Sequence, residues 1–250
     1  MTDFSRNELI WGKDNQVTLA EKHVTVFGLG GVGGFALEAL ARAGVCNFTI
    51  VDFDVVSESN INRQIVALNS TVGKKKTDLF RERLLDINPK INVRCIDDFY
   101  SENLRDECFK DKTDFVIDAI DTMRSKIDLL VYCYRNNIPV VTSMGAGNRI
   151  NPTELYIADI SELDTKKCVF TRNVLYQLKK QGIEKGITAV SSKEKPMVLE
   201  KLSVTENIVT KQGEEFEFNK ITPGSTPFVP AVAGYYLGWY VLDNLLKTPQ

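Results

Sequence analysis

A glycine-rich segment near the amino end constrains the fold of this chain more than any other feature. Residues 28–34 read Gly-Leu-Gly-Gly-Val-Gly-Gly; a short strand-like run at 23–27 precedes them, and apolar residues at helical spacing follow as far as Gly44. A strand, a glycine turn and a helix in this order let a phosphate approach backbone N–H groups at a helix N-terminus. The spacing therefore predicts a nucleotide site lined by Gly28, Gly30 and Gly33.

A carboxylate stands at the distance that such a site requires. The apolar run at 48–51 delivers Asp52 roughly 20 residues after the glycines, where a carboxylate can accept hydrogen bonds from ribose hydroxyls. The glycine spacing alone also occurs in ordinary turns. The strand before it, the helix after it and the acid together favour a nucleotide site.

The residues after Asp52 distinguish between NAD and ATP. A dinucleotide-binding dehydrogenase holds pyrophosphate mostly with loop amides and the helix dipole. This chain instead places basic and amide side chains soon after the acid, namely Asn60, Arg63, Gln64 and Lys76. An arginine and a lysine that converge on a phosphate chain offset the charge that develops when the α-phosphate is attacked. The sequence therefore favours ATP over NAD.

Alternating strand-like and helical segments predict the fold class. The strand patterns lie at 24–28, 47–52, 92–96, 115–119 and 138–142, and the helical patterns at 34–43, 74–87, 101–109 and 123–136. This alternation is typical of an α/β protein with a doubly wound, mostly parallel, Rossmann-like sheet. With 250 residues, 43% of them hydrophobic, we expect one domain, 1–250. Its nucleotide-binding half is 1–150, and its second half, 151–250, extends the same sheet.

The residues named so far resemble those of the E1-like adenylating enzymes, which include the activators of ubiquitin-type and sulfur-carrier proteins. The resemblance spans nearly the whole chain and implies an E1-type adenylation fold that uses ATP and Mg²⁺. It implies catalytic roles for Arg63 and Lys76, and both catalytic and metal-binding roles for Asp121. It also implies that Arg6 reaches into the site of a partner subunit, and hence a homodimer. The residues that it assigns to nucleotide binding are Gly28, Gly30, Gly31, Gly33, Asp52, Asp54, Asn60 and Gln64.

Within this family the second half is most similar to the tRNA threonylcarbamoyladenosine dehydratases. The similarity lies in four stretches, 143–149, 171–183, 191–196 and 224–234. It implies an enzyme that adenylates the carboxylate of the N6-threonylcarbamoyl group on adenosine 37 of tRNA and then closes a ring with net loss of water. The helix near Arg172 departs from the more basic version expected of these enzymes, because its charge lies mainly at its end.

The charge balance limits where RNA can bind. A formal net charge of -2 gives no overall basic excess to offset phosphate repulsion. A tRNA surface must then be a local patch, and an ordinary solvated helix face is the alternative. The candidates for such a patch are Arg172, Lys179, Lys180, Lys185, Lys193 and Lys195.

The cysteines bear on the competing hypotheses. The chain has five, scattered and without a C-x-x-C pair, which favours reduced thiols in the cytoplasm and argues against structural zinc. Sulfur-carrier activators often carry two such pairs. An adenylating activator of a ubiquitin-like sulfur-carrier protein is the second hypothesis, and a scaffold partner of a cysteine desulfurase is the third. Cys168 is interpreted as a bystander thiol, and the single histidine, His23, as structural.

Two segments of the second half complete the expectations. The polar stretch at 191–223 predicts a long, mobile loop of the kind that often serves function. The apolar stretch at 228–246 is about long enough to cross a bilayer, but its aromatic residues sit mid-segment and no basic cluster flanks it. We expect a helix packed on the sheet or on a dimer partner, and no stable membrane insertion.

Overall fold

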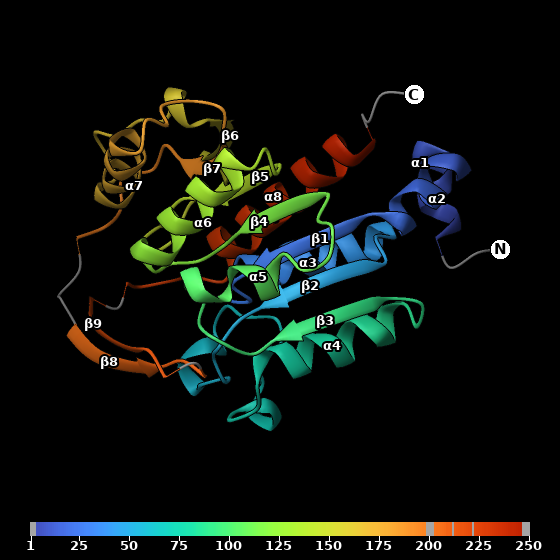
Figure 1. The fold of residues 1–250 in the computed structure, drawn as a ribbon, viewed down its shortest axis with the longest axis horizontal. Coiled ribbons are helices and arrows are strands. Elements are labelled where there is room, and N and C mark those ends of the chain that lie inside the picture. Colours follow the sequence, from blue (N-terminus) through green and yellow to red (C-terminus); the bar gives the residue numbers. More distant parts are fainter. Residues whose placement is uncertain (1–3, 199–202, 212, 222, 247–250) are drawn as a thin grey trace.

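One mixed sheet forms the middle layer of the structure. The computed structural model describes residues 4–198, 203–211, 213–221 and 223–246. Seven strands pair in the order β3-β2-β1-β4-β5-β7-β6 (Figure 1). Neighbours are parallel except β6, which runs antiparallel to β7. The strands are β1 (His23–Phe27), β2 (Asn47–Val51), β3 (Asn92–Ile96), β4 (Phe115–Asp118), β5 (Val140–Ser143), β6 (Leu155–Asp159) and β7 (Thr188–Ser192).

Helices cover both faces of this sheet, which confirms the predicted doubly wound α/β class. One face carries α3, α4 and α8, and the other carries α5, α6 and α7. Two short helices, α1 and α2, precede β1 and were not anticipated from the sequence. The helices are α1 (Ser5–Trp11), α2 (Lys13–Glu21), α3 (Gly33–Ala43), α4 (Lys76–Ile87), α5 (Arg105–Cys108), α6 (Met123–Arg135), α7 (Val169–Lys180) and α8 (Phe228–Leu246).

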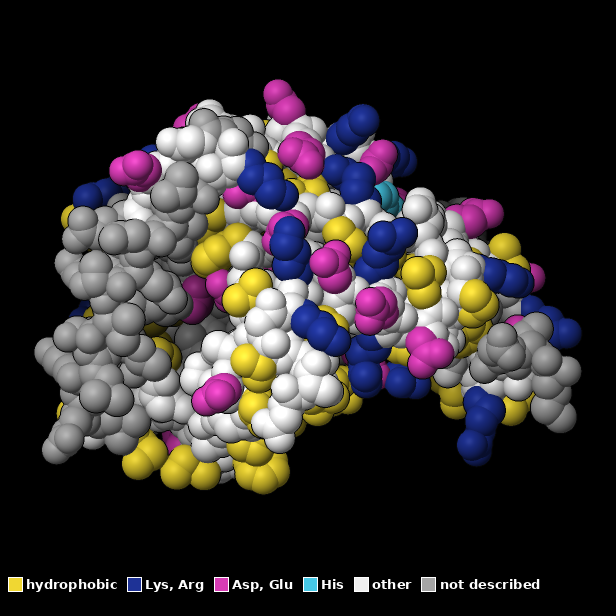
Figure 2. All heavy atoms as spheres, turned by 90° about the horizontal axis from the view of Figure 1, so that it is seen from below, with side chains coloured by type: hydrophobic (Ala, Val, Ile, Leu, Met, Phe, Trp, Pro, Cys, Tyr) yellow, Lys and Arg dark blue, Asp and Glu magenta, His cyan; other side chains and the backbone are white. Residues whose placement is uncertain are grey.

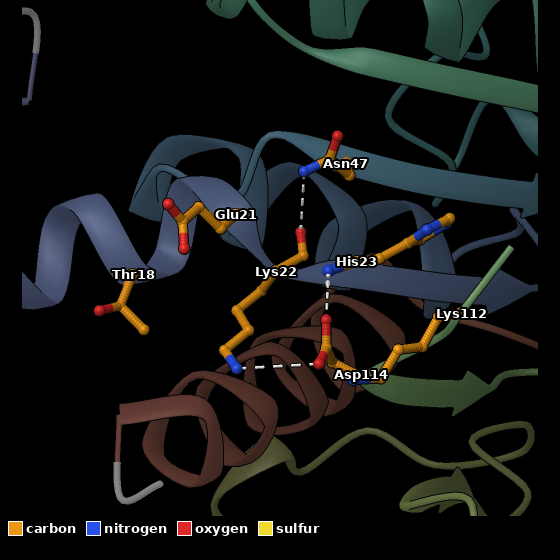
Figure 3. A pocket seen from close by; sticks show the side chains of 7 residues that line it. All are labelled: Thr18, Glu21, Lys22, His23, Asn47, Lys112 and Asp114. Atoms are coloured by element: carbon orange, nitrogen blue, oxygen red, sulfur yellow. Dashed lines mark hydrogen bonds and ion pairs between the residues drawn. The ribbon is translucent and has the colours of Figure 1, made fainter. Parts of the chain in front are cut away.

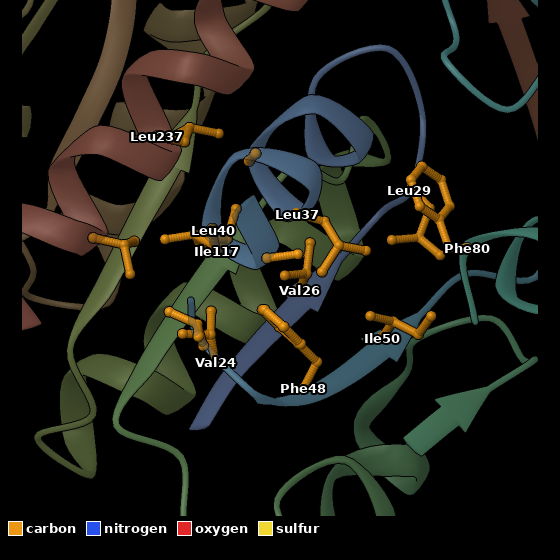
Figure 4. Packing of buried hydrophobic residues seen from close by; sticks show 14 of the residues in the cluster. Val24, Val26, Leu29, Leu37, Leu40, Phe48, Ile50, Phe80, Ile117 and Leu237 are labelled. Atoms are coloured by element: carbon orange, nitrogen blue, oxygen red, sulfur yellow. The ribbon is translucent and has the colours of Figure 1, made fainter. Parts of the chain in front are cut away.

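Alternation of side chains along the strands divides the core into two layers. Val24 and Val26 of β1 pack on the α3 side, whereas Phe27 packs on the α6 side, as the two-residue period of a strand requires. Figure 4 shows Leu37 and Leu40 of α3 above the strands on the first side. Both faces of the sheet are therefore covered by apolar side chains, and the polar groups that can serve function lie at the strand ends.

The apolar stretch at 228–246 is helix α8, packed on α3 and the sheet, as expected. Glycines at the contact let the two helices approach closely. A Cβ atom on Gly234 would lie 2.3 Å from the Val32 carbonyl oxygen, and one on Gly238 would lie 3.2 Å from that of Ala36. Among the described residues, no helix combines the length and the apolarity that crossing a bilayer requires.

The expectation of one long loop at 191–223 is wrong. This stretch forms an antiparallel hairpin of β8 (Ser203–Val209) and β9 (Glu215–Ile221), a sheet separate from the main one. The charged residues hid the period-two alternation of Glu215-Phe216-Glu217-Phe218, which is a strand pattern. Residues 199–202, 212 and 222 lie outside the described part, so the predicted mobility is not addressed there.

The hairpin docks on the nucleotide-binding half through aromatic rings. Phe216 lies 5.1 Å from Phe99 between ring centroids, and Phe99 lies 5.2 Å from Phe53. The Arg124 guanidinium stands 5.3 Å above the Phe216 ring, and Ser101 donates a hydrogen bond of 2.8 Å to Glu214. The predicted helix at 101–109 is a 3-10 turn, Glu102–Leu104, that runs into the short α5.

Candidate nucleotide-binding site

The expected site residues follow neighbouring strands of the sheet. The glycine loop follows β1, Asp52 and Asp54 follow β2, and Asp121 lies shortly after β4. Because β1 pairs in parallel with both β2 and β4, these segments emerge at the same edge. The strand order reverses here, which is where open α/β sheets form a crevice for ligands.

The glycine loop is folded so tightly that side chains are excluded. Gly28 has a φ of +86°, and a Cβ atom there would lie 2.7 Å from the Ala119 carbonyl oxygen. A Cβ atom on Gly33 would lie 1.8 Å from the Gly28 carbonyl oxygen. Helix α3 begins at Gly33 with no side chain capping it, so its first turn has the form of an anion-binding helix N-terminus.

Asp52 ties the glycine loop to the end of β2. Its two carboxylate oxygens accept hydrogen bonds from the backbone N–H groups of Leu29 (2.6 Å) and Asp54 (2.8 Å). Burial raises the pKa of Asp52 to about 6, and the charge of Asp54 adds to this effect while that of Lys76 opposes it. The sequence indicated the carboxylate but not this clamp on the loop.

Lys76 and Asp54 form an ion pair beside Asp52. Lys76 opens α4 and is only 3% exposed. Its Nζ lies 2.6 Å from Asp54 Oδ2, and its backbone N–H donates to the Asp54 carbonyl oxygen (3.1 Å). The Asp54 side chain is 43% exposed. The pair therefore lies near the surface, where it places the Lys76 ammonium group at the crevice.

The 3-10 turn η1 (Glu58–Asn60) and the turn after it bring three of the predicted residues to the glycines. Arg63 Cγ would lie 3.2 Å from a Cβ atom on Gly31, and Gln64 Nε2 would lie 3.7 Å from one on Gly30. Asn60 is buried and accepts a hydrogen bond from the Ser57 backbone N–H (3.2 Å). Gln64 Oε1 is a buried oxygen that has no hydrogen-bond partner, as an atom that awaits a ligand would be.

Arg63 lies within the electrostatic reach of Asp121. Its guanidinium donates to the Ser59 carbonyl oxygen (2.7 Å) and to Asn62 (2.9 Å). Burial lowers the pKa of Arg63, and the charge of Asp121 acts in the opposite direction. The structure thus brings every predicted site residue except Arg6 to the topological switch point of the sheet, called here the crevice.

Arg6 is the predicted site residue that this chain does not bring to the crevice. It lies exposed on α1, at the end of the molecule opposite the strand arrowheads (Figure 1). Such a position provides no contact with the chain's own glycine loop. A role for Arg6 therefore requires a second subunit.

Comparison with known proteins identifies the family. The model of the ThiF family matches residues 4–247. The chain belongs to the ThiF family. It is 43% identical to a tRNA threonylcarbamoyladenosine dehydratase of Bacillus subtilis over 98% of this chain and 94% of that relative.

Solved structures agree with this assignment of the ThiF-family chain. Two structures of the E. coli tRNA N6-threonylcarbamoyladenosine dehydratase, in complex with ATP and with AMP, match it with TM-scores of 0.84 and 0.85. Both are 31% identical in sequence and cover 98% of this chain; the matches span 93% and 94% of those chains. The resemblance and the fold predicted from the sequence are confirmed.

A buried triad at the end of β4 was missed at the level of sequence. Lys126 Nζ lies 2.6 Å from Asp118 Oδ2 and 2.9 Å from Thr142 Oγ1, and all three side chains are fully buried. The other carboxylate oxygen of Asp118 accepts from the Ile120 backbone N–H (3.1 Å). The triad fixes the turn that leads to Asp121. A buried strand ending in aspartate was the available signal, but its partners come from α6 and β5.

The metal chemistry of the site rests on few ligands. Within the part of the chain that the structure describes, no three His, Cys, Asp or Glu side chains gather as metal ligands. Mg²⁺ is usually held by one or two carboxylates together with substrate phosphates. Asp121, whose charge acts on Arg63, fits an ion shared with phosphates and not an all-protein cage.

A pocket lies at the opposite ends of the strands, away from the glycine loop. It has a volume of about 410 Å³ and is lined by Thr18, Glu21, Lys22, His23, Asn47, Lys112 and Asp114 (Figure 3). Lys22 pairs with Asp114 at 3.7 Å, and the His23 backbone N–H donates to the same carboxylate. The charges of Lys22 and Asp114 therefore balance one another.

Proposed function

We propose that this chain uses ATP to dehydrate and cyclise N6-threonylcarbamoyladenosine in tRNA, through adenylation of the substrate carboxylate. The observation that carries the proposal is the near full-length similarity to a tRNA threonylcarbamoyladenosine dehydratase at 43% identity. Structures of an E. coli relative in complex with ATP and with AMP fit a reaction that consumes the first and releases the second.

The proposed chemistry has two steps. The substrate carboxylate attacks the α-phosphate of ATP, so that a carboxylate–phosphate bond forms and pyrophosphate leaves. The neighbouring carbamoyl group of the same substrate then attacks the activated carbonyl carbon, which closes the ring and expels AMP. Because this second attack is intramolecular, its effective molarity replaces a dedicated enzyme nucleophile. Lys76 and Arg63 offset the negative charge that develops in the first step.

The crevice suits the nucleotide in its details. The side-chain-free loop of Gly28, Gly30, Gly31 and Gly33 leaves room for phosphates beside the first turn of α3. The unpaired Gln64 Oε1 supplies an acceptor, and Asp52 is the acceptor for ribose hydroxyls. Asn60 and Asp54 complete the nucleotide-binding set, with Asp54 placing the Lys76 ammonium group.

Asp121 holds Mg²⁺ in this proposal. When bound, the ion neutralises part of the triphosphate charge. Asp121 would hold this ion, and its charge acts on Arg63. The carboxylate would thus bind the metal while the guanidinium binds the phosphates.

The proposed active unit is a homodimer in the cytoplasm. Leu9 and Ile10 of α1 are 85% and 80% exposed, and Trp239 of α8 is 57% exposed. Large apolar side chains that face solvent often mark an interface. Arg6, on the same helix as Leu9 and Ile10, would enter the partner's crevice. A cysteine desulfurase or sulfur acceptor is a further candidate partner.

The decisive experiment is nucleoside mass analysis. Threonylcarbamoyl-modified tRNA incubated with the chain, ATP and Mg²⁺ should yield a nucleoside lighter by one water, and Lys76→Ala should yield none. If the nucleoside is unchanged while a carrier protein ending in glycine stimulates ATP–pyrophosphate exchange, the chain activates a sulfur carrier instead.

A further inference from the structure

A cluster of five cations lies on two loops and the first turn of α7, close to the reaction crevice. We infer that the phosphate backbone of the tRNA lies on this cluster, an inference that rests on the proposed function. Its members, called here the Lys167 cluster, are Lys166, Lys167, Arg172, Lys193 and Lys195, and all five are exposed.

Tertiary contacts, and not the sequence, assemble the Lys167 cluster. Lys166 and Lys167 precede α7, whereas Lys193 and Lys195 follow β7. Lys167 Nζ donates to the Lys193 carbonyl oxygen (2.9 Å), which joins the two loops. The Lys193 ammonium group stands 5.7 Å from the centre of the Tyr156 ring. A cationic surface with an aromatic ring suits RNA, whose phosphates seek cations and whose unpaired bases stack on rings.

The two acids within the same segments accept hydrogen bonds from backbone N–H groups. Residues 164–172 and 193–195 contain two acids, Asp164 and Glu194, against the five cations. Asp164 Oδ1 accepts from the Lys166 backbone N–H (2.8 Å). Glu194 accepts from the backbone N–H groups of Ile150 and Asn151 at 3.0 to 3.2 Å. The cluster therefore keeps a local positive excess, in contrast to the face in Figure 2, where the two signs are interspersed.

A chain of hydrogen bonds places the Lys167 cluster next to the crevice. Asn62, the neighbour of Arg63, donates to the Ser225 carbonyl oxygen (2.9 Å). The adjacent Gly224 exchanges hydrogen bonds of 2.6 and 2.7 Å with Asn148. The Asn148 carbonyl oxygen accepts from the backbone N–H of Met197 (2.8 Å), two residues beyond Lys195.

A buried arginine joins the loop after β7 to the segment that follows β5. Arg149 is 3% exposed, and its guanidinium donates to the carbonyl oxygens of Gly147 (3.2 Å) and Glu194 (3.3 Å). Glu194 lies between Lys193 and Lys195. Phe170, between Lys167 and Arg172, would lie 3.5 Å from a Cβ atom on Gly145. The loop after β7 and the start of α7 are thus held against residues 145–149, which follow β5.

The other basic residues of α7 are less suited to this role. Lys179 and Lys180 lie at the opposite end of the helix, about 15 to 17 Å along its axis from Val169. Lys179 pairs with Glu184 at 3.2 Å, and the Lys180 ammonium group stands 4.5 Å from the Tyr176 ring centre. Of the patch expected from the sequence, Arg172, Lys193 and Lys195 belong to the Lys167 cluster, whereas Lys179, Lys180 and Lys185 do not.

The test compares two pairs of neutralised lysines. Lys193→Ala combined with Lys195→Ala should weaken tRNA binding about tenfold at about 0.1 M salt, and should flatten its salt dependence by about 0.7 to 0.9 per lost phosphate contact. Lys166→Ala combined with Lys167→Ala should do the same. The matched control, Lys179→Ala combined with Lys180→Ala, removes equal charge from the far end of α7 and should bind tRNA like the unaltered chain.

Filter binding with tRNA, calorimetry with ATP and thermal melting separate the outcomes. Unchanged ATP affinity and Tm in a variant that loses tRNA binding support the inference. Native tRNA affinity in both cluster variants, or an equal loss in the control, overturns it while the proposed function stands. An unaltered chain that binds ATP and no tRNA overturns the proposed function itself.

Discussion

At the scale of single residues, burial and charge set the behaviour of the crevice. Asp52 is 8% exposed and shares its surroundings with Asp54 and Lys76. Two negative charges and one positive charge together favour the uptake of a proton or a cation here. The motif indicated the residue types, but only their mutual burial raises the Asp52 pKa to about 6.

We expect adenosine binding to weaken on acidification through this pKa. With a pKa of about 6, only about a tenth of the Asp52 carboxyls are ionised at about pH 5, so affinity should fall about tenfold from its value at about pH 8. Adenosine is the ligand of choice because it carries no phosphate that titrates, and calorimetry gives the affinity. Asp52→Asn should bind weakly at both pH values; a flat profile for the unaltered chain would contradict the expectation.

The same pKa has a consequence for stability. Because it exceeds the value of about 4 for aspartate in an unfolded chain, the folded chain holds the proton more tightly. The contribution of Asp52 to the free energy of unfolding therefore falls as the pH rises from about 4 through about 6. The Asp52 carboxylate is ionised at neutral pH although its charge lowers the stability of the fold, as is common where a site needs an ionised acceptor.

Lys76 and its neighbour Lys75 provide a matched pair for mutation. Lys76→Met removes a buried cation from the crevice and should lower turnover of modified tRNA by about 100-fold or more, the range seen when a charge-stabilising group is removed. Lys75 is 52% exposed and pairs with Asp97, so Lys75→Met should retain turnover. Equal losses in both variants would show that Lys76 has no special part in the chemistry.

At the scale of elements, strand ends and their anchors decide the geometry of the site. The alternation of strands and helices was predictable because each element carries its own period of apolar residues. The Asp118, Lys126 and Thr142 triad was not, because it joins β4, α6 and β5. A buried ion pair of this kind is costly to break from one side.

Lys126→Met should therefore destabilise the chain by roughly 3 to 5 kcal/mol, because it leaves the Asp118 charge buried and unpaired. Guanidinium-induced unfolding gives the free energy. The double variant Asp118→Asn with Lys126→Met removes both charges and should recover part of the loss. If the single variant is as stable as the unaltered chain, the triad does not hold β4, α6 and β5 together in the way described.

At the scale of the whole molecule, Arg6 is the expected site residue that lies away from the others, exposed on α1. The exposed Leu9 and Ile10 lie on the same helix as Arg6, which favours a second copy of the chain as the partner whose crevice Arg6 enters. Closed two-fold dimers place the same surface of each subunit on the other. Each crevice of such a dimer would receive the Arg6 of its partner.

Mixing two inactive variants tests this arrangement. If Arg6 acts in the partner's site, a dimer of Arg6→Ala with Lys76→Ala contains one site in which both residues are intact. Random exchange of subunits should then restore about a quarter of the native turnover, since half of the dimers are mixed and half of their sites are complete. Each variant alone should be inactive. Absence of recovery, with mixed dimers verified by native mass spectrometry, would place Arg6 outside the partner's site.

The sequence by itself determined the glycine turn, the acid after the second strand and the alternation of strands and helices. These depend only on residue spacing within short segments and on the period of apolar residues in each. Local spacing did not predict the hairpin of β8 and β9, because its many charged residues resemble those of a loop. The pairing of the two strands is a tertiary feature. Tertiary structure alone decided the Asp52 pKa, the buried triad and the meeting of the Lys167 cluster with the crevice. Each of these depends on groups far apart in the chain that share a low-dielectric or hydrogen-bonded neighbourhood, and such neighbourhoods exist only after the chain has folded.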